Sequence, residues 1–133
     1  MLLDTSGLLC CLDADEARHS SAVEHYLAAQ LRITHNYVLA EFVALTHARR
    51  LPRDASLAFA ANLTADPRVE VVWVDVRIHD EALKLLQSQL DKAYSLCDAV
   101  SFLLMRHRGI RTALTSDRHF DQAGFERLLP SHG

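Results

Sequence analysis

Apolar residues recur along this chain in two alternating patterns, one typical of helices and one typical of strands. In the segment 35–50, Val38, Phe42 and Leu45 are three or four residues apart and therefore fall on one face of a helix. Gly109 follows the last helical segment, and we expect it to end that helix as a left-handed C-cap. The other expected helices are 15–30, 52–66, 77–90 and 94–109.

Short runs of β-branched, aliphatic and aromatic residues lie between these helices and predict strands. The expected strands are 1–4, 31–34, 69–74, 110–115 and 125–130. We expect residues 5–7 to form a loop after the first strand, and residues 116–124 to form a loop or a short helix. Strands that alternate with helices predict an α/β fold with a short, mainly parallel sheet, flanked by helices on both faces. The length of 133 residues corresponds to a single domain, which we place at residues 1–133.

Composition and charge exclude several classes of protein. The formal net charge is −3 and no block of Lys or Arg is present, so charge alone does not indicate a nucleic-acid-binding protein. Three cysteines (Cys10, Cys11 and Cys97) form no spaced framework, which favours reduced thiols and a cytoplasmic location. The first residues lack the basic segment of a signal peptide, and no apolar run is long enough to span a membrane.

Four acids stand at positions where sequence reasoning expects apolar residues or strand ends. Asp4 ends the first expected strand, and Asp117 follows the strand 110–115. Glu41 shares the apolar face of its helix, and Asp98 opens a helix that is otherwise largely apolar. An aspartate or glutamate is seldom buried unless something compensates its charge, so these acids are candidates for a common site.

Each of these acids also has a structural explanation. Asp4 could cap a turn, and Asp117 could cap a helix. Ser95 and Asp98 match the S-x-x-D pattern of a capping box. An arginine could neutralise Glu41; the candidates are Arg49 and Arg106.

Taken together, the four carboxylates favour a metal site. Two carboxylates about 4 Å apart repel each other by roughly 4 kcal/mol at an effective dielectric near 20, so a cluster of them either takes up protons or binds a cation. Among the four acids only Asp117 has a basic immediate neighbour, Arg118. Oxygen ligands select hard divalent ions such as Mg²⁺ or Mn²⁺, which activate water for hydrolysis of phosphodiesters.

Four ordered motifs that span nearly the whole chain resemble one known family. They are LLDTSGLL (2–9), VLAEFVAL (38–45), YSLCDAVSFLLM (94–105) and ALTSDRHFDQAGFERLLP (113–130). By these motifs the chain resembles a PIN domain, and more closely a VapC-like toxin of a type II toxin–antitoxin pair.

The resemblance implies a three-layer PIN-like fold and a Mg²⁺- or Mn²⁺-dependent endoribonuclease. Many relatives carry a further acid where this chain has His119, and Asp121 is a candidate substitute for it. The resemblance also implies an RNA substrate (transfer or ribosomal RNA), a cognate antitoxin and a homodimer. It assigns catalysis and metal binding to Asp4, Glu41, Asp98 and Asp117, with hydroxyl support from Thr5 and Ser116.

Basic residues near the last two acids are candidates for RNA contact, with a solvated surface as the alternative. For Arg106 and Arg108, complementing the negative end of a helix is a further alternative. Asp75 also follows an expected strand, and we interpret it as the N-cap of the next helix. The RNA-contact candidates are Arg106, Arg118 and His119, and less specifically Arg108, Arg111, His107 and His132.

Two other functions remain open from the sequence. A PIN-like module that binds RNA or protein without cutting would be consistent with His119 in place of an acid. A receiver-like α/β domain would use Asp4 or Asp75 to accept a phosphoryl group, but it leaves Glu41 and Asp98 without a role.

Overall fold

The computed structural model describes residues 1–130, so the candidate RNA contact His132 lies outside the described residues. The strands are β1 (Leu2–Leu3), β2 (Arg32–His35), β3 (Val69–Val72), β4 (Thr112–Leu114) and β5 (Glu126–Arg127). The helices are α1 (Thr5–Leu12), α2 (His19–Ala28), α3 (Asn36–Ala48), α4 (Arg53–Ala65), α5 (Val76–Ser88), α6 (Leu96–Arg108) and α7 (Arg118–Gln122).

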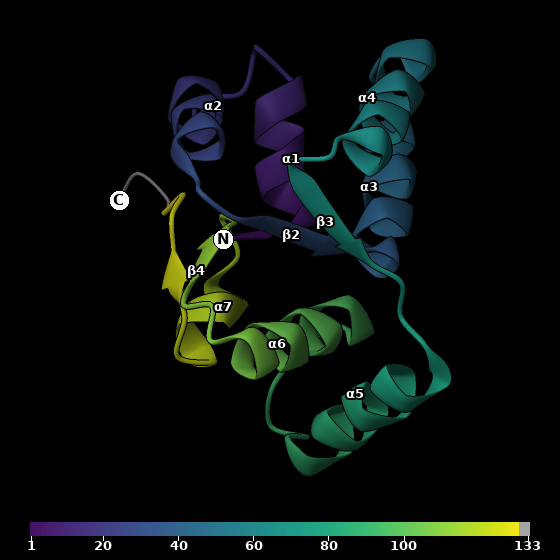
Figure 1. Cartoon of the computed structure of the whole chain (residues 1–133), viewed down its shortest axis with the longest axis vertical. Coiled ribbons are helices and arrows are strands. Elements are labelled where there is room, and N and C mark those ends of the chain that lie inside the picture. The colour runs from purple at the N-terminus through teal and green to yellow at the C-terminus, as the bar shows by residue number, and fades with distance from the viewer. Residues whose placement is uncertain (131–133) are drawn as a thin grey trace.

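The strands form one parallel sheet in the order β3-β2-β1-β4-β5. Figure 1 shows α1 to α4 on one side of this sheet and α5 and α6 on the other, which confirms the predicted three-layer α/β architecture. From β1 the chain first builds outward through β2 and β3, and later inserts β4 on the opposite side of β1. In open parallel sheets, the carboxyl ends of the strands at such a reversal are where ligands bind.

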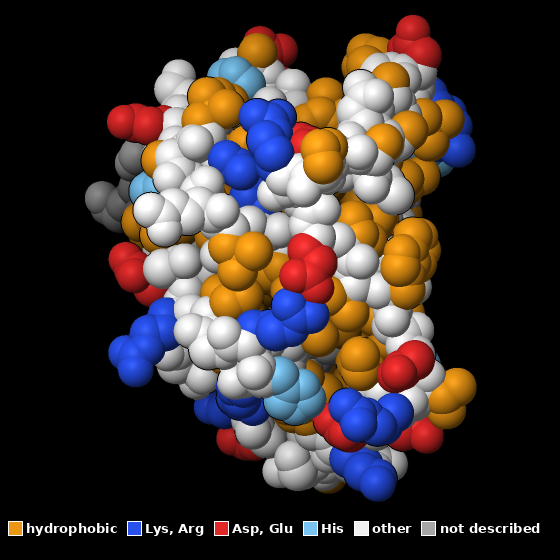
Figure 2. All heavy atoms as spheres, in the orientation of Figure 1, with side chains coloured by type: hydrophobic (Ala, Val, Ile, Leu, Met, Phe, Trp, Pro, Cys, Tyr) orange, Lys and Arg blue, Asp and Glu red, His pale blue; other side chains and the backbone are white. Residues whose placement is uncertain are grey.

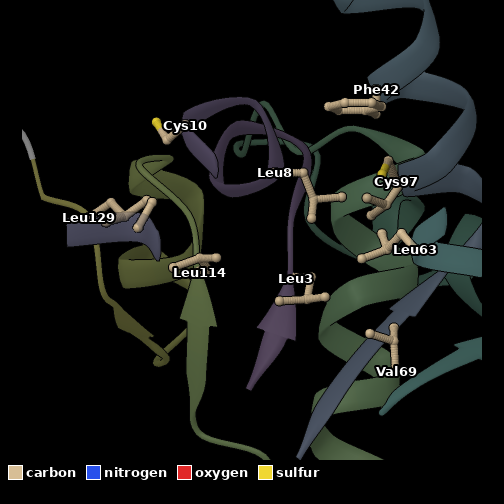
Figure 3. Packing of buried hydrophobic residues seen from close by; sticks show 11 residues of the cluster. Leu3, Leu8, Cys10, Phe42, Leu63, Val69, Cys97, Leu114 and Leu129 are labelled. Atoms are coloured by element: carbon tan, nitrogen blue, oxygen red, sulfur yellow. The ribbon is translucent and has the colours of Figure 1, made fainter. Parts of the chain in front are cut away.

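Successive strand residues point into two different hydrophobic cores, one on each face of the sheet. Leu3 and Leu114 pack with Phe42 in the core beneath α1 to α4 (Figure 3). Leu2 and Ala113 join the second core, against α6 and α7. Burying each leucine contributes about 1.5–3 kcal/mol, so the two-residue periodicity of β1 and β4 fixes which residue faces which layer.

The region after β1 is helical, and the prediction of a loop at residues 5–7 is wrong. Helix α1 begins at Thr5, directly after the strand, with Asp4 as its N-cap residue. Gly7 makes this close entry possible: a Cβ there would lie 1.9 Å from the carbonyl oxygen of Leu114. Without a side chain at residue 7, the first turn of α1 packs directly against the end of β4, so both chain segments lie at the same sheet edge.

Several other boundaries differ from the expected ones. Helix α2 starts at His19 rather than residue 15. Strand β3 ends at Val72 rather than at residue 74. Beyond the strand, the backbone N–H of Val74 donates to the side-chain Oδ1 of Asn36 at 2.7 Å. The last strand covers only 126–127 of the expected 125–130.

The predicted helix caps are confirmed. Oδ1 of Asp75 accepts from the backbone N–H of Ile78 at 2.9 Å, as an N-cap does. Gly109 ends α6 in the left-handed conformation with φ of 65°. None of the helices in residues 1–130 is both long and apolar enough to cross a membrane.

Candidate metal centre

Two of the predicted acids lie at the carboxyl ends of adjacent strands. Asp4 directly follows β1, and its backbone N–H donates to the carbonyl oxygen of Leu114 at 3.2 Å. Asp117 follows β4 after Thr115 and Ser116, and its carboxylate caps α7 by accepting from the backbone N–H of His119 at 2.9 Å. The parallel pairing of β1 with β4 therefore brings residues 4 and 117 to one edge of the sheet.

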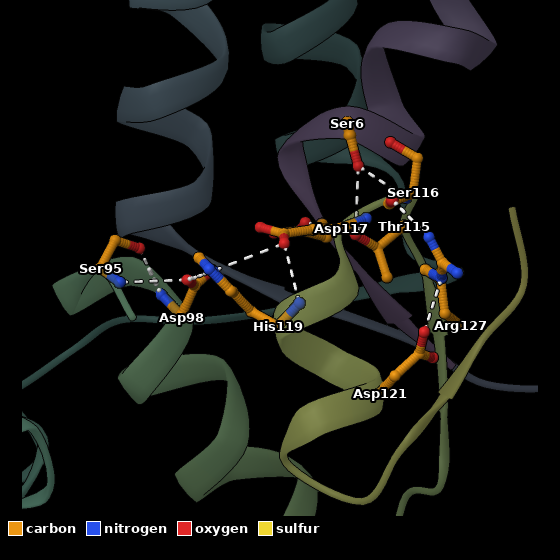
Figure 4. A network of polar contacts seen from close by, with 10 residues as sticks. Ser6, Ser95, Asp98, Thr115, Ser116, Asp117, His119, Asp121 and Arg127 are labelled. Atoms are coloured by element: carbon orange, nitrogen blue, oxygen red, sulfur yellow. Dashed lines mark hydrogen bonds and ion pairs between the residues drawn. The ribbon is translucent and has the colours of Figure 1, made fainter. Parts of the chain in front are cut away.

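Asp98 enters from the first turn of α6, where it has two structural partners. It forms the predicted capping box: its Oδ2 accepts from the backbone N–H of Ser95 at 3.0 Å, and the Ser95 hydroxyl accepts from the backbone N–H of Asp98 at 3.0 Å. The same Oδ2 lies 2.8 Å from Nδ1 of His119, and this contact links α6 to α7 (Figure 4). These bonds fix the rotamer of Asp98 and hold its carboxylate at the site. The side chain is nearly buried, with 8% of it exposed.

Glu41 approaches from α3 and is the exposed member of the set. Oxygen atoms of Asp4 and Glu41 and the sulfur of Cys97 all lie within 4.8 Å of one another. Atoms of Asp98, Asp117 and His119 form a second group with the same mutual spacing. The four acids are thus distributed over two clusters.

Electrostatics connect the two clusters. Burial raises the pKa of Asp4 to about 7; the carboxylates of Asp98 and Glu41 raise it as well, whereas the hydroxyl of Thr115 opposes the shift. Burial, together with the carboxylates of Glu41 and Asp4, also raises the pKa of the Cys97 thiol, which is therefore a neutral neighbour of the site.

Hydroxyl groups hold the strand ends together, but they are not the predicted ones. The hydroxyl of Thr115 donates to Oδ2 of Asp4 at 2.7 Å and accepts from the backbone N–H of Asp117 at 3.0 Å. Ser6 in turn contacts the Thr115 hydroxyl at 3.1 Å and accepts from the backbone N–H of Ser116 at 3.0 Å. Ser116, expected to support a carboxylate with its hydroxyl, takes part through its backbone (Figure 4).

Thr5 is the other predicted hydroxyl, and it lies beside Asp4 without a partner. Its Oγ1 is buried and forms no hydrogen bond with residues 1–130. A buried hydroxyl without a partner costs free energy, so its presence next to a buried carboxylate favours an additional polar ligand at this position.

Asp121, the candidate substitute for an acid at position 119, forms an ion pair with Arg127. This ion pair joins Oδ2 of Asp121 to Nε of Arg127 at 3.0 Å, and Nη1 of Arg127 donates to the carbonyl oxygen of Ser116 at 3.1 Å. His119 itself turns toward the acids, with Nδ1 at 3.4 Å from Oδ1 of Asp117 in addition to its contact with Asp98.

Arginines do not neutralise the four acids within residues 1–130. The candidate partner of Glu41, Arg49, forms its ion pair with Glu16 at 3.1 Å instead. Arg106, the other candidate, packs its guanidinium over Phe125 at 5.7 Å. The only ion-pair partner of the four acids in this part of the chain is His119, which contacts Asp98 and Asp117.

The basic residues near the acids in sequence are spread out in space. Arg106 lies eight residues beyond Asp98, which corresponds to about 12 Å along the helix axis. Arg108 pairs with Glu70 at 2.6 Å, at the same distal end of α6. Arg118, exposed at the start of α7 next to Asp117, is the arginine that remains beside the acids. On the face in Figure 2, Lys and Arg side chains form several separate groups rather than one broad patch.

Sequence reasoning missed His35, which anchors two of the elements that carry the acids. It ends β2, its Nδ1 accepts from the backbone N–H of Val38 at 3.4 Å, and its Nε2 contacts the hydroxyl of Ser101 in α6 at 2.8 Å. Burial lowers the pKa of His35 to about 3, so the ring is neutral. His35 therefore ties the start of α3 to α6.

The residues present fit a divalent metal ion. Four carboxylates lie in two clusters without a compensating Lys or Arg in residues 1–130, two of them (Asp4 and Asp98) are buried, and the Thr5 hydroxyl beside Asp4 lacks a partner. Carboxylate oxygens are the donors that Mg²⁺ and Mn²⁺ take up in proteins.

The chain is similar to several known proteins. The family model described as PIN domain matches residues 1–126. The 23S rRNA-specific endonuclease VapC20 of Mycobacterium tuberculosis is 34% identical over 131 residues, which are 98% of this chain and 98% of that protein. Ribonuclease VapC26 of the same species is 32% identical over 122 residues, covering 90% of this chain and 89% of that protein. A crystal structure of M. tuberculosis VapC20, described as a Sarcin-Ricin loop cleaving toxin, matches with a TM-score of 0.85 and 32% identity over 93% of this chain and 95% of that chain.

Proposed function

The chain belongs to the PIN-domain family, and from this premise we propose that it is the endoribonuclease toxin of a toxin–antitoxin pair. We propose further that residues 1–133 form one PIN domain and that its activity depends on a divalent ion. The observation that carries the proposal is that Asp4, Glu41, Asp98 and Asp117, which come from four different elements, lie in two electrostatically coupled clusters without an arginine or lysine partner in residues 1–130.

The four acids would hold Mg²⁺ or Mn²⁺. The bound ion would supply Lewis acidity, lowering the pKa of water and offsetting the charge that develops on the phosphodiester. Asp4 is fixed by Thr115, and Asp98 by its capping box, so their oxygens are in place before substrate arrives. Glu41 is exposed, and it would orient the attacking water by accepting a hydrogen bond from it.

Ribosomal RNA is the substrate class that the comparisons favour. The relative with 34% identity over almost the full length of both chains is named for 23S rRNA. Arg118 is exposed beside Asp117, and its guanidinium would contact the RNA backbone there, with His119 on the same helix. With such a substrate, the activity would be cytoplasmic.

The expected partners are a cognate antitoxin and a second copy of this chain, which together with the first would form a homodimer. Helix α4 carries the Leu- and Ala-rich segment 56–65 and exposes Leu57. Its residues Phe59 and Leu63 also line a cavity of about 270 Å³ with Val23 and Tyr26 of α2. These apolar side chains form a candidate contact surface for another protein.

Cleavage of purified ribosomal RNA tests the proposal. The wild type with Mg²⁺ or Mn²⁺ should cut at defined positions, and EDTA or Asp98→Asn should abolish cutting. Asp75→Asn is the matched control, because Asp75 is an exposed helix N-cap outside the two acidic clusters, and asparagine caps a helix equally well. Cleavage that survives both EDTA and Asp98→Asn would contradict the proposal, and sequencing the RNA ends identifies the cut sites.

The contacts of His119 favour one alternative function, binding without cleavage. His119 bonds to two of the four acids and could occupy them permanently. RNA affinity with neither cleavage nor calorimetric binding of Mg²⁺ or Mn²⁺ would support a binding module and exclude the nuclease.

A further inference from the structure

His119 places a nitrogen donor among the acids. Its Nδ1 lies 2.8 Å from Oδ2 of Asp98 and 3.4 Å from Oδ1 of Asp117. The three side chains are mutually close enough to share one ion. An imidazole at this position changes the chemistry of the site, because Mg²⁺ prefers oxygen donors whereas first-row transition ions also accept imidazole nitrogen.

The ring is held in this orientation by contacts on two sides. Its backbone N–H donates to Oδ1 of Asp117, which fixes residue 119 at the start of α7. The ring also makes an edge contact with Tyr94, with centroids 5.4 Å apart and planes at 76°. Tyr94 is itself buried and packs edge-on against Phe102 at 5.0 Å. Such support keeps a ligand ring in place whether or not an ion is bound.

The second nitrogen of the ring can take the proton that coordination displaces. At 2.8 Å from a carboxylate oxygen, Nδ1 carries a hydrogen and donates it to Asp98. Coordination through Nδ1 requires that proton to reside on Nε2, which has no hydrogen-bond partner in residues 1–130. The side chain is 27% exposed, so water can serve as that partner.

The neighbouring thiol does not compete for this role. Cys97 is buried and lies in the other cluster, with Asp4 and Glu41. His119 is the one nitrogen donor in the two clusters, and the one donor other than oxygen beside Asp98 and Asp117.

From this geometry we propose that His119 is a metal ligand that makes the Asp98–Asp117 position selective for a first-row transition dication, such as Mn²⁺, over Mg²⁺. The inference rests on the proposed metal-dependent function and specifies which ion that function uses. His119 is then part of the metal centre, not a residue that blocks it.

Calorimetric titration with MnCl₂ and with MgCl₂ tests the selectivity. For the wild type we expect tighter binding of Mn²⁺ than of Mg²⁺. In His119→Asp, which restores an all-oxygen set, the ratio of the two affinities should fall by about tenfold, the lower end of what changes around a metal usually produce. His119→Asn is the second variant, in case the added charge prevents folding, and it should lower the ratio in the same direction. His47→Asn, an exposed histidine at the end of α3, is the matched control and should leave the ratio unchanged.

Pulsed electron paramagnetic resonance of the Mn²⁺-loaded protein gives a readout that does not depend on activity. Nitrogen-14 modulation from a coordinated imidazole should be present in the wild type and in His47→Asn, and absent in His119→Asp. Modulation that persists in His119→Asp, or equal losses of Mn²⁺ and Mg²⁺ affinity, would overturn the proposal and leave His119 a positioning residue for Asp98. If neither ion binds the wild type, the proposed metal-dependent function fails as well. If RNA cleavage needs a metal but the ratio of Mn²⁺ to Mg²⁺ affinity is the same in His119→Asp and the wild type, only the role of His119 fails.

Discussion

Replacing Asp4 with asparagine should stabilise the metal-free protein, by an amount that depends on pH. Asp4 is buried at the end of β1, where burial and the carboxylates of Asp98 and Glu41 raise its pKa from 3.8 to about 7. Ionising Asp4 therefore costs more in the folded protein than in the unfolded chain. Asparagine retains an oxygen that can accept the hydrogen bond from Thr115 but carries no charge.

The size of the effect follows from the two pKa values. Since the folded-state pKa is the higher one, the folded protein binds more protons than the unfolded chain between pH 4 and pH 7. The contribution of Asp4 to stability therefore grows as the pH falls, by about 2.5 kcal/mol between pH 8 and pH 5. Asp4→Asn lacks this term, so its advantage over the wild type should be largest at pH 8 and shrink by that amount at pH 5.

Urea unfolding in EDTA at several pH values between 5 and 8 measures this difference. Asp75→Asn serves as the control, because Asp75 is an exposed helix cap outside the acidic clusters, and its difference from the wild type should not change with pH in this way. Saturating Mg²⁺ should reverse the order by stabilising the wild type, by about 2.7 kcal/mol at a hundredfold excess over Kd, and Asp4→Asn less. A stability gap between Asp4→Asn and the wild type that stays constant from pH 5 to pH 8 would refute the reasoning.

Three further outcomes follow from the structure. Burial lowers the folded-state pKa of His35 to about 3, so the contribution of His35 to stability should fall by about 2 kcal/mol from pH 7 to pH 5. Urea unfolding of His35→Asn should not show this loss, and an identical pH slope for the variant and the wild type would contradict the prediction. Gly7→Ala should cost several kcal/mol or prevent folding, as seen in its melting curve, because the new methyl group meets the β4 backbone; a normal melting temperature would show that α1 can move. Thr115→Val should lower stability by about 1–3 kcal/mol and weaken metal binding, because it removes the hydrogen bond to Asp4. Thr115→Ser should keep the wild-type stability and metal affinity, and equal values for the two variants in calorimetry would rule out a role for the hydroxyl.

The acids were predictable because their positions conflict with their surroundings. Asp4 and Asp117 follow expected strands, and the carboxyl ends of parallel strands lie at one edge of a sheet, so these two acids were expected together. Helical spacing predicts Glu41 on an apolar face, whereas the structure leaves its side chain exposed. The structural explanations for Asp98 and Asp117 also hold, since both act as caps while they contribute to the site. A capping acid and a site acid are therefore not exclusive interpretations.

Local patterns could not reveal the supporting contacts. The helix at residues 5–12 depends on the absence of a side chain at Gly7 and on the position of β4, more than 100 residues away in sequence. Ser116 and Thr115 are both adjacent hydroxyl residues near Asp117, and only the twist of the chain after β4 decides that Thr115 faces Asp4. In the sequence, His35 is only the first residue of the expected helical segment 35–50, and its contacts with α3 and α6 depend on the fold.

The strand order has a consequence for the cell that makes this protein. Because β4 pairs with β1 from the far end of the chain and Asp117 comes after it, a growing or prematurely ended polypeptide that stops before this strand carries three of the acids and lacks the fourth. Under the proposed function, a polypeptide that stops before residue 117 would therefore lack nuclease activity.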